Sequence, residues 1–154
     1  MASLSPILSE VISAGGSVQL TVTGNSMRPM LRHRVSHVKL SAVHNPRVGD
    51  VPLYRRDNGA FVLHRIVRAD GDSFTMCGDN QWQLEKGIRR DQLIAVITDF
   101  SRDGIHWCSC SHSAYAVYWK FWVGIRPLRH LLIGGYRRAR RFGGRLLRKL
   151  GLRR

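Results

Sequence analysis

The sequence predicts a mainly β protein: a compact antiparallel β domain with a short N-terminal helix and a basic, helical C-terminal tail. Three observations support this class, namely helical spacing of apolar residues at the start, short β-type runs through the middle, and an aromatic, basic stretch from Ala114 onward. A chain of 154 residues can bury one good core but is too short for two full domains. We therefore expect one domain with an appendage.

A short amphipathic helix is predicted at the start of the chain. Its apolar residues follow the i, i+3, i+4, i+7, i+8 spacing of one helix face: Leu4, Ile7, Leu8, Val11 and Ile12. Ser5 can cap this helix, and the pair Gly15-Gly16 ends it. We expect the helix to pack against the domain rather than to enter a membrane.

The middle of the chain predicts the β domain. Short runs of β-type residues occur at Ser17–Thr23, Ser36–Ala42, Val51–Arg55, Phe61–Arg68, Ser73–Cys77 and Leu93–Phe100. Clusters of Gly, Pro, Asn and Asp separate them, and such clusters form turns. Short strands joined by tight turns favour an antiparallel arrangement.

The charge is divided unevenly along the chain. Residues 1–103 carry 13 basic and 10 acidic side chains, whereas residues 104–154 carry 12 basic side chains and no acidic one. We therefore predict a nearly neutral domain over residues 1–103 and a basic aromatic tail over residues 104–154. Lys120, Arg126 and Arg129 each oppose insertion into a bilayer by about 2.5–3.5 kcal/mol, which outweighs the gain from the apolar residues around them.

The tail is instead expected to lie at a membrane interface. Over residues 114–154, basic side chains can reach anionic headgroups while the aromatic and aliphatic ones enter the interface. Nucleic acid is the less favoured partner, although arginines can neutralise phosphates and aromatic rings can stack on bases. The aromatic residues stand beside Phe121, Val123 and Ile125, a mixture suited to lipid or to burial. A solvated helix bound to nothing is a third option.

The cysteines predict neither a disulfide framework nor a metal centre. Cys77, Cys108 and Cys110 are an odd and sparse set. In the run from His106 to His112, the possible ligands alternate along an extended chain and span roughly 20 Å, too far for one tetrahedral metal. We expect a loop with free thiols, no metal and no cofactor.

The first candidate for chemistry is Ser26, in the run Gly24-Asn25-Ser26-Met27-Arg28-Pro29 at the end of a β run. A serine hydroxyl is a weak nucleophile and needs a base within hydrogen-bond reach. The second is His64, in the run Phe61-Val62-Leu63-His64-Arg65-Ile66. An imidazole with a pKa near 6.5 can accept a serine proton at neutral pH.

The third candidate is Asp79, in the run Gly78-Asp79-Asn80. A carboxylate can orient a base imidazole and stabilise the imidazolium. Asp91 is the alternative acid. Glu85 is expected to be structural, pairing with Arg89 or Arg90. A turn at Ser26, a hydrogen-bonded strand histidine and an Asx turn at Asp79 are the plain structural alternatives.

In this order and at these gaps, the three motifs resemble those of the signal peptidase I superfamily, which includes the LexA-type repressors. Histidine at position 64 resembles the endoplasmic-reticulum and archaeal type and small bacterial relatives, whereas other members carry lysine there. The resemblance covers about residues 17–100 and implies a signal-peptidase-like or LexA-like β domain. It implies Ser26 as nucleophile, His64 as general base and Asp79 as supporting acid. Many members carry a serine where this chain has Gly24, so the oxyanion hole is expected from the Ser26 N–H, helped by Asn25.

The resemblance implies a serine endopeptidase that removes a leader or signal-type segment from a precursor peptide, after residues with small side chains. Two alternatives stay open: a self-cleaving LexA-like protein, and a non-catalytic relative that binds peptides or anionic surfaces. The first residues show neither a signal peptide nor an N-terminal anchor. The expected location is bacterial and peripheral on a membrane; the cytoplasmic face is favoured over the outer face, and both placements stay open.

Overall fold

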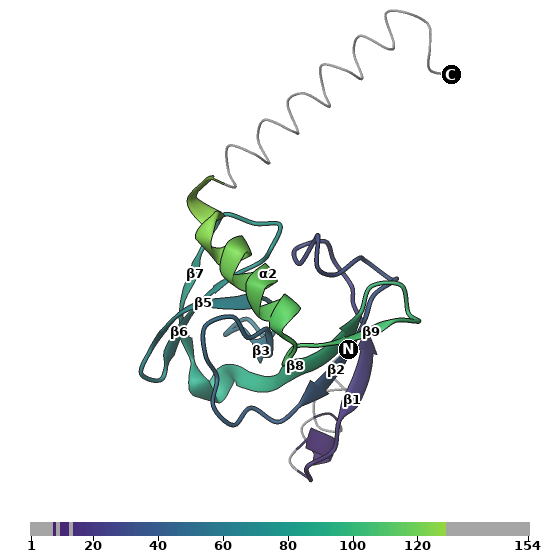
Figure 1. Ribbon diagram of the computed structural model, residues 1–154. Coiled ribbons are helices and arrows are strands. Elements are labelled where there is room, and N and C mark those ends of the chain that lie inside the picture. The colour runs from purple at the N-terminus through teal and green to yellow at the C-terminus, as the bar shows by residue number, and fades with distance from the viewer. Residues whose placement is uncertain (1–7, 9, 13, 129–154) are drawn as a thin grey trace, which may run out of the picture.

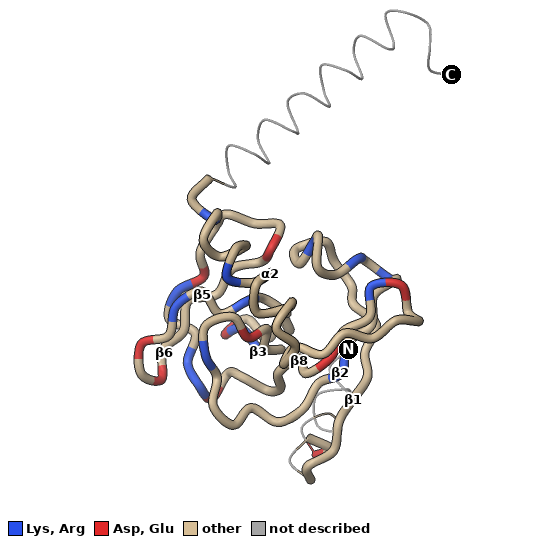
Figure 2. The backbone as a smooth tube through the Cα atoms, viewed as in Figure 1, with Lys and Arg blue, Asp and Glu red and all other residues tan. Residues whose placement is uncertain are grey.

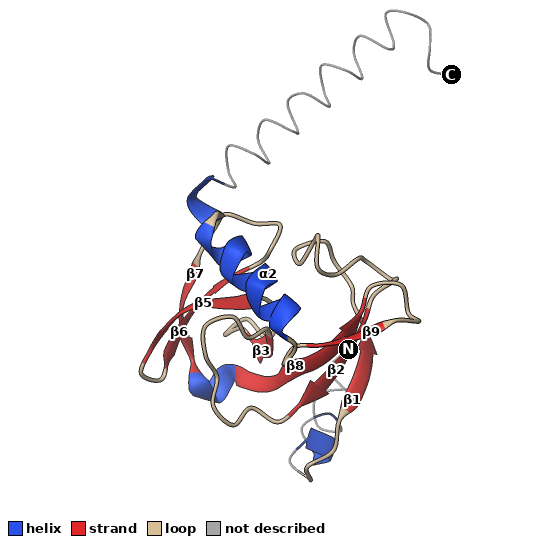
Figure 3. Ribbon diagram, in the orientation of Figure 1, coloured by secondary structure: helices blue, strands red, loops and turns tan. Residues whose placement is uncertain are grey.

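The computed structural model describes residues 8, 10–12 and 14–128 (Figure 1). These residues form two antiparallel sheets, so the predicted mainly β class is confirmed. The larger sheet contains β1 (Val18–Thr21), β2 (His37–Ser41), β3 (Pro52–Arg55), β4 (Phe61–Leu63), β8 (Leu93–Ser101) and β9 (Trp107–Ser109). The smaller sheet contains β5 (Arg65–Asp70), β6 (Ser73–Cys77) and β7 (Glu85–Arg89). A 3₁₀ turn, η1 (Arg90–Gln92), precedes β8, and α2 (Ser113–Gly124) follows β9 (Figure 3).

The strand order of the larger sheet is β1-β2-β8-β3-β4, with β9 added on β8. Strands β1 and β4 are therefore the two ends of this path. Alternating burial along β2 turns Val38 and Leu40 into the core, where they pair in register with Phe100 and Ile97 of β8. The sheet curls around this apolar layer. The helical residue Leu8 and four buried residues that follow β1 complete the layer: Val22, Met27, Met30 and Leu31.

The predicted N-terminal helix is confirmed over the residues that the structure describes there. Leu8, Glu10, Val11 and Ile12 are helical, and Leu8 and Ile12 are buried, as the i, i+4 spacing predicts. The helix ends at Gly15, whose φ of +79° is the left-handed conformation that glycine adopts at helix ends. The predicted start at Leu4–Ile7 lies outside the described residues.

Two strands were not predicted. The run Glu85–Arg89 forms β7, although it is mostly polar, because it pairs with β6 through Phe74 and Ile88. The run Trp107–Ser109 forms β9 rather than the expected loop. The single predicted run Phe61–Arg68 is in fact two strands, β4 and β5, which belong to different sheets and meet at His64.

The boundary predicted at residue 103 falls inside the folded unit. Strand β9 extends the larger sheet, and α2 packs against the domain through Tyr115, which is buried in the main core. The ring of Trp119 lies directly over Gly49, where a Cβ atom would approach it to 2.5 Å. The helix therefore belongs to the domain, and the remaining tail, residues 129–154, lies outside the described residues. Within the described residues, 8, 10–12 and 14–128, the structure contains no helix that combines the length and the apolar composition of a membrane span.

Candidate active site

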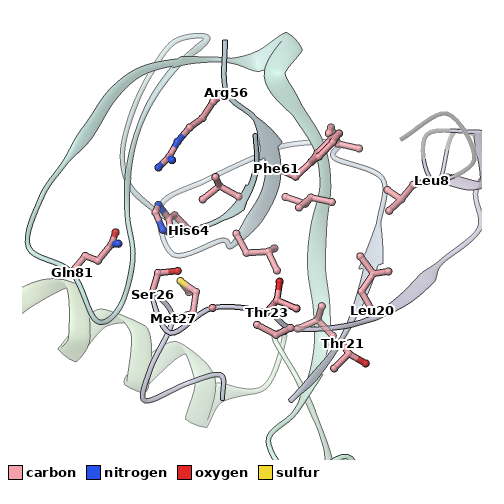
Figure 4. A pocket seen from close by; sticks show the side chains of 17 residues that line it. Leu8, Leu20, Thr21, Thr23, Ser26, Met27, Arg56, Phe61, His64 and Gln81 are labelled. Carbon is pink, nitrogen blue, oxygen red and sulfur yellow. The ribbon is translucent and has the colours of Figure 1, made fainter. Parts of the chain in front are cut away.

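A cavity of about 490 Å³ opens between the two ends of the larger sheet (Figure 4). One wall is the continuous run from Leu20 to Gly24, which leads to Ser26. The other wall is the continuous run from Phe61 to Leu63, which leads to His64. The side chains of Ser26 and His64 point toward each other at one end of this cavity (Figure 4). The structure thus brings together the two residues that the sequence selected first.

The turn formed by Gly78, Asp79 and Asn80 holds the loop that carries Ser26. The Asn80 backbone N–H donates to the Ser26 carbonyl oxygen at 2.7 Å, and the Asn80 side-chain amide donates to the Asn25 carbonyl oxygen at 3.1 Å. A Cβ atom at Gly78 would lie 2.7 Å from the Ser26 carbonyl oxygen, so only glycine permits this approach. The third sequence motif therefore positions Ser26 through its backbone.

Gly24 has a backbone reason to be glycine. Its φ is +97°, outside the range that L side chains readily adopt, while the space around its missing Cβ is open. Its N–H donates to Nδ1 of His33 at 2.8 Å. A serine hydroxyl at position 24 would have room but would strain the backbone. Over the described part of the chain, the Ser26 N–H and the Asn25 amide donate no hydrogen bond.

His64 lies between β4 and β5 with only 4% of its surface exposed. Burial lowers the pKa of its imidazole from 6.5 to about 4, and Glu85, whose charge favours the protonated form, offsets this only in part. The side chain is therefore neutral at pH 7 and can accept a proton. Within the described residues the Ser26 hydroxyl makes no hydrogen bond; contacts between nucleophile and base are often loose before substrate binds.

The partners of His64 select the tautomer that a general base needs. The Tyr54 hydroxyl lies 3.2 Å from His64 Nδ1 and donates its one proton to Glu85 Oε2 at 2.9 Å. Because that proton is already engaged, Nδ1 must carry a hydrogen and donate it to the Tyr54 oxygen. The other ring nitrogen, Nε2, is then an unprotonated acceptor.

Glu85 is the carboxylate of this site. Its Oε2 lies 3.8 Å from His64 Nδ1, and its two oxygens accept hydrogen bonds from the Arg56 guanidinium. The bonds from Arg56 and Tyr54 hold the pKa of Glu85 below its usual value although partial burial raises it. A chain of contacts thus runs from Arg56 through Glu85 and Tyr54 to His64. The expectation that Glu85 pairs with Arg89 or Arg90 is wrong.

Asp79 does not occupy the place predicted for it. Both of its carboxylate oxygens accept hydrogen bonds from Arg65, at 2.9 Å and 2.7 Å, and both side chains are 1% exposed. Burial alone would lower the pKa of Arg65, but the bonds and charge of Asp79 raise it above its ordinary value. Arg65 also donates to the carbonyl oxygen of Gly49 and to the Tyr115 hydroxyl, so it joins the smaller sheet to α2. Asp79 therefore binds this arginine, and it influences the imidazole only through its charge, which raises the pKa of His64 less than the charge of Glu85 does.

The alternative acid, Asp91, is also remote from His64 in its contacts. Its carboxylate pairs with Arg89 at 3.1 Å on the exposed surface, and it does not line the cavity. No group of three metal-ligating side chains occurs among residues 8–128. Sequence reasoning missed Tyr54 and Arg56 altogether. Tyr54 could have been found from the β3–β4 hairpin, because its register places Tyr54 opposite Val62 and diagonal to His64. Arg56 belongs to the site through its hydrogen bonds to Glu85.

Comparison of the chain with known proteins finds no matching family model and no matching curated sequence.

Proposed function

We propose that this protein is a serine endopeptidase in which Ser26 attacks the peptide carbonyl and His64 accepts the serine proton. One observation carries the proposal: two walls of one cavity end at a serine and at a buried, neutral histidine that face each other (Figure 4). An apolar cleft with a few convergent polar groups is the usual setting of an active site. The resemblance of the three motifs to signal peptidases is consistent with this chemistry.

The contacts around His64 suit each step of such a reaction. Nε2 takes the proton of the Ser26 hydroxyl as the oxygen attacks, which makes the imidazole cationic. The bond from Nδ1–H to Tyr54 keeps the ring oriented, and the charge of Glu85 stabilises the cation. The negative oxygen of the tetrahedral intermediate can accept from the Ser26 N–H and from Asn25. His64 then returns the proton to the leaving amine as the C–N bond breaks, which leaves an acyl ester on Ser26. A water molecule that gives a proton to His64 hydrolyses this ester, and His64 returns the proton to the Ser26 oxygen.

The cavity walls indicate how a substrate would bind. Strands β1 and β4 end the path of the larger sheet, so each presents one backbone edge to the cavity. An extended peptide between two strand edges can form β-type hydrogen bonds with both, while its side chains enter the apolar floor. We propose a precursor peptide cut in an extended segment; the small side chains before the cut rest on the family resemblance.

Mass spectrometry of a mixture of synthetic extended decapeptides tests the activity. The full chain is expected to cut a subset at internal bonds, and Ser26→Ala is expected to cut none because the nucleophile is gone. Ser73→Ala, an exposed serine at the start of β6, is the matched control and keeps full activity.

Two results would overturn the proposal. Cleavage that persists in Ser26→Ala excludes Ser26 as nucleophile, and a wild-type chain that binds peptides but cuts none is a binding protein. Incubating the purified chain alone separates the self-cleaving alternative, because that reaction shortens the 17.5 kDa chain without added peptide.

A further inference from the structure

Helix α2 carries apolar side chains on two opposite faces. Its inner face packs on the domain: Tyr115 is buried, the Tyr118 hydroxyl donates to Asp79, and the Trp122 indole donates to the Asp79 carbonyl oxygen. The rings of Tyr118 and Trp122 also stack on each other at 6.0 Å. These contacts satisfy the inner face within the domain.

The outer face of the same helix is apolar and open. Val117 is 69% exposed and Phe121 is 61% exposed. Together with Ala114 and Gly124, which are also exposed, these residues recur along α2 at intervals of three and four and form one stripe. We call Ala114, Val117, Phe121 and Gly124 the outer stripe. Leu128, which is 55% exposed, follows the turn at Ile125 and lies beyond the end of α2. A helix that is apolar all round is normally covered on every side, so the outer stripe indicates a missing apolar partner.

Charge decides between the partners that could cover this face. Residues 104–154 carry 12 basic side chains and no acidic one, and the whole chain has a net charge of +15. Lys120 and Arg126 are the charged side chains of residues 104–128 (Figure 2), and the other ten basic residues belong to residues 129–154, outside the described part. A second copy of the chain would bring like charge against like charge. An anionic lipid surface offers negative headgroups beside an apolar layer, which matches both properties of the segment.

The arrangement of the rings argues against nucleic acid on this helix. Binding of single strands relies on aromatic faces that bases can stack upon. Tyr115, Tyr118 and Trp122 have their rings in the contact with the domain or against one another. The open side chains are mainly aliphatic, with Phe121 the one aromatic ring among the outer stripe.

We propose that the outer stripe of α2 is a docking surface for anionic membranes, into which Val117 and Phe121 insert. The surface has a direct structural link to the candidate active site. The inner face of α2 binds Asp79, and the next residue, Asn80, donates to the Ser26 carbonyl oxygen. A membrane that holds α2 therefore also sets the orientation of the Ser26 loop and cavity relative to the lipid. Docking itself does not depend on the proposed peptidase activity.

Co-sedimentation of the full chain with vesicles tests the docking surface. Vesicles of equal parts phosphatidylglycerol and phosphatidylcholine are compared with vesicles of phosphatidylcholine alone. The double variant Val117→Ser/Phe121→Ser is expected to partition at least about tenfold less onto the anionic vesicles, because two inserted apolar side chains are lost. Ile105→Ser is the matched control, since Ile105 is 75% exposed on the loop between β8 and β9 and should change binding little.

Each outcome decides for or against the outer stripe. The proposal holds if the wild type binds only the anionic vesicles, the double variant loses binding, and both proteins share one circular dichroism spectrum and melting temperature. It is overturned if the wild type does not bind, if the double variant binds like the wild type, or if Ile105→Ser loses as much. It is also overturned if the double variant loses binding to a single-stranded oligonucleotide, or dimerisation, but keeps its binding to vesicles. Ser26→Ala should bind vesicles like the wild type, which separates this test from that of the peptidase.

Discussion

Protonation of His64 should destabilise the folded protein between pH 7 and pH 4.5. The imidazole is buried, and its pKa in the folded state is lowered from 6.5 to about 4. Over this range the unfolded chain binds a proton at His64 and the folded chain does not, so stability falls as the pH falls. The contribution is fully present above about pH 6.5 and is lost progressively toward pH 4. At about 1.36 kcal/mol per pKa unit, the full difference corresponds to about 3 kcal/mol.

Urea unfolding at pH 7.0, 6.0, 5.0 and 4.5 measures this loss. The reference protein is His64→Asn, because the Asn amide can replace Nδ1–H as donor to the Tyr54 hydroxyl but has no charge to gain. The unfolding free energy of the wild type is expected to fall by about 2–3 kcal/mol more than that of His64→Asn. Glu85, whose lowered pKa adds a loss of the same sign at still lower pH, is common to both proteins.

Direct titration of His64 should give the same low pKa. The His64 ring signals in NMR are expected to titrate near pH 4, and the acid limb of any peptidase activity should lie below pH 6 in the free protein. Parallel stability curves for wild type and His64→Asn, or ring signals that titrate at or above pH 6, would refute a buried neutral base.

Three substitutions test the other parts of the site. Gly78→Ala should lower kcat of the peptidase on the order of a hundredfold with less effect on the melting temperature, because the added Cβ displaces the Ser26 carbonyl. Kinetics of the peptide assay measure this change, and an unchanged kcat contradicts it. Asp79→Asn should lower the unfolding free energy by about 3–5 kcal/mol, because Arg65 keeps a buried charge without its partner; a stable variant with reduced activity would instead return Asp79 to the imidazole. Glu85→Gln should keep its stability within about 1 kcal/mol yet lower kcat on the order of tenfold, since a negative charge near the imidazolium is lost; an unaltered rate would remove Glu85 from the mechanism.

The strand pattern of the middle region was predictable because it depends on local chemistry. Runs of β-branched and apolar residues bounded by turn residues predicted β2 and β6 almost to the residue. Strands β7 and β9 were missed because their residues, apart from Ile88 and Trp107, are polar, small or charged. Both form because a neighbouring strand offers an unpaired edge, which no local pattern reports.

The length of the folded unit was also misjudged from the sequence. The change in charge after residue 103 suggested a boundary there, yet the aromatic residues of α2 pack on Gly49 and Arg65. Charge follows the solvent-facing side chains, whereas the domain boundary follows the buried ones. Tyr115 and Trp119 are the aromatic residues that join α2 to the core. They contact residues that lie far away in the chain, such as Gly49, so the local sequence does not show that they are buried there.

At the candidate site, local motifs selected Ser26 and His64 as candidates, and the folded chain places both side chains on one cavity. The motifs could not show which carboxylate lies beside the imidazole, because Asp79, Glu85 and Asp91 all follow His64 in the chain. Neighbouring residues of an extended chain point to opposite faces. The His64 side chain therefore lines the cavity, whereas the Arg65 side chain points away from it and binds Asp79. Strand pairing across the two sheets then brings Tyr54 and Glu85 to the imidazole, a result of register that only the folded chain decides.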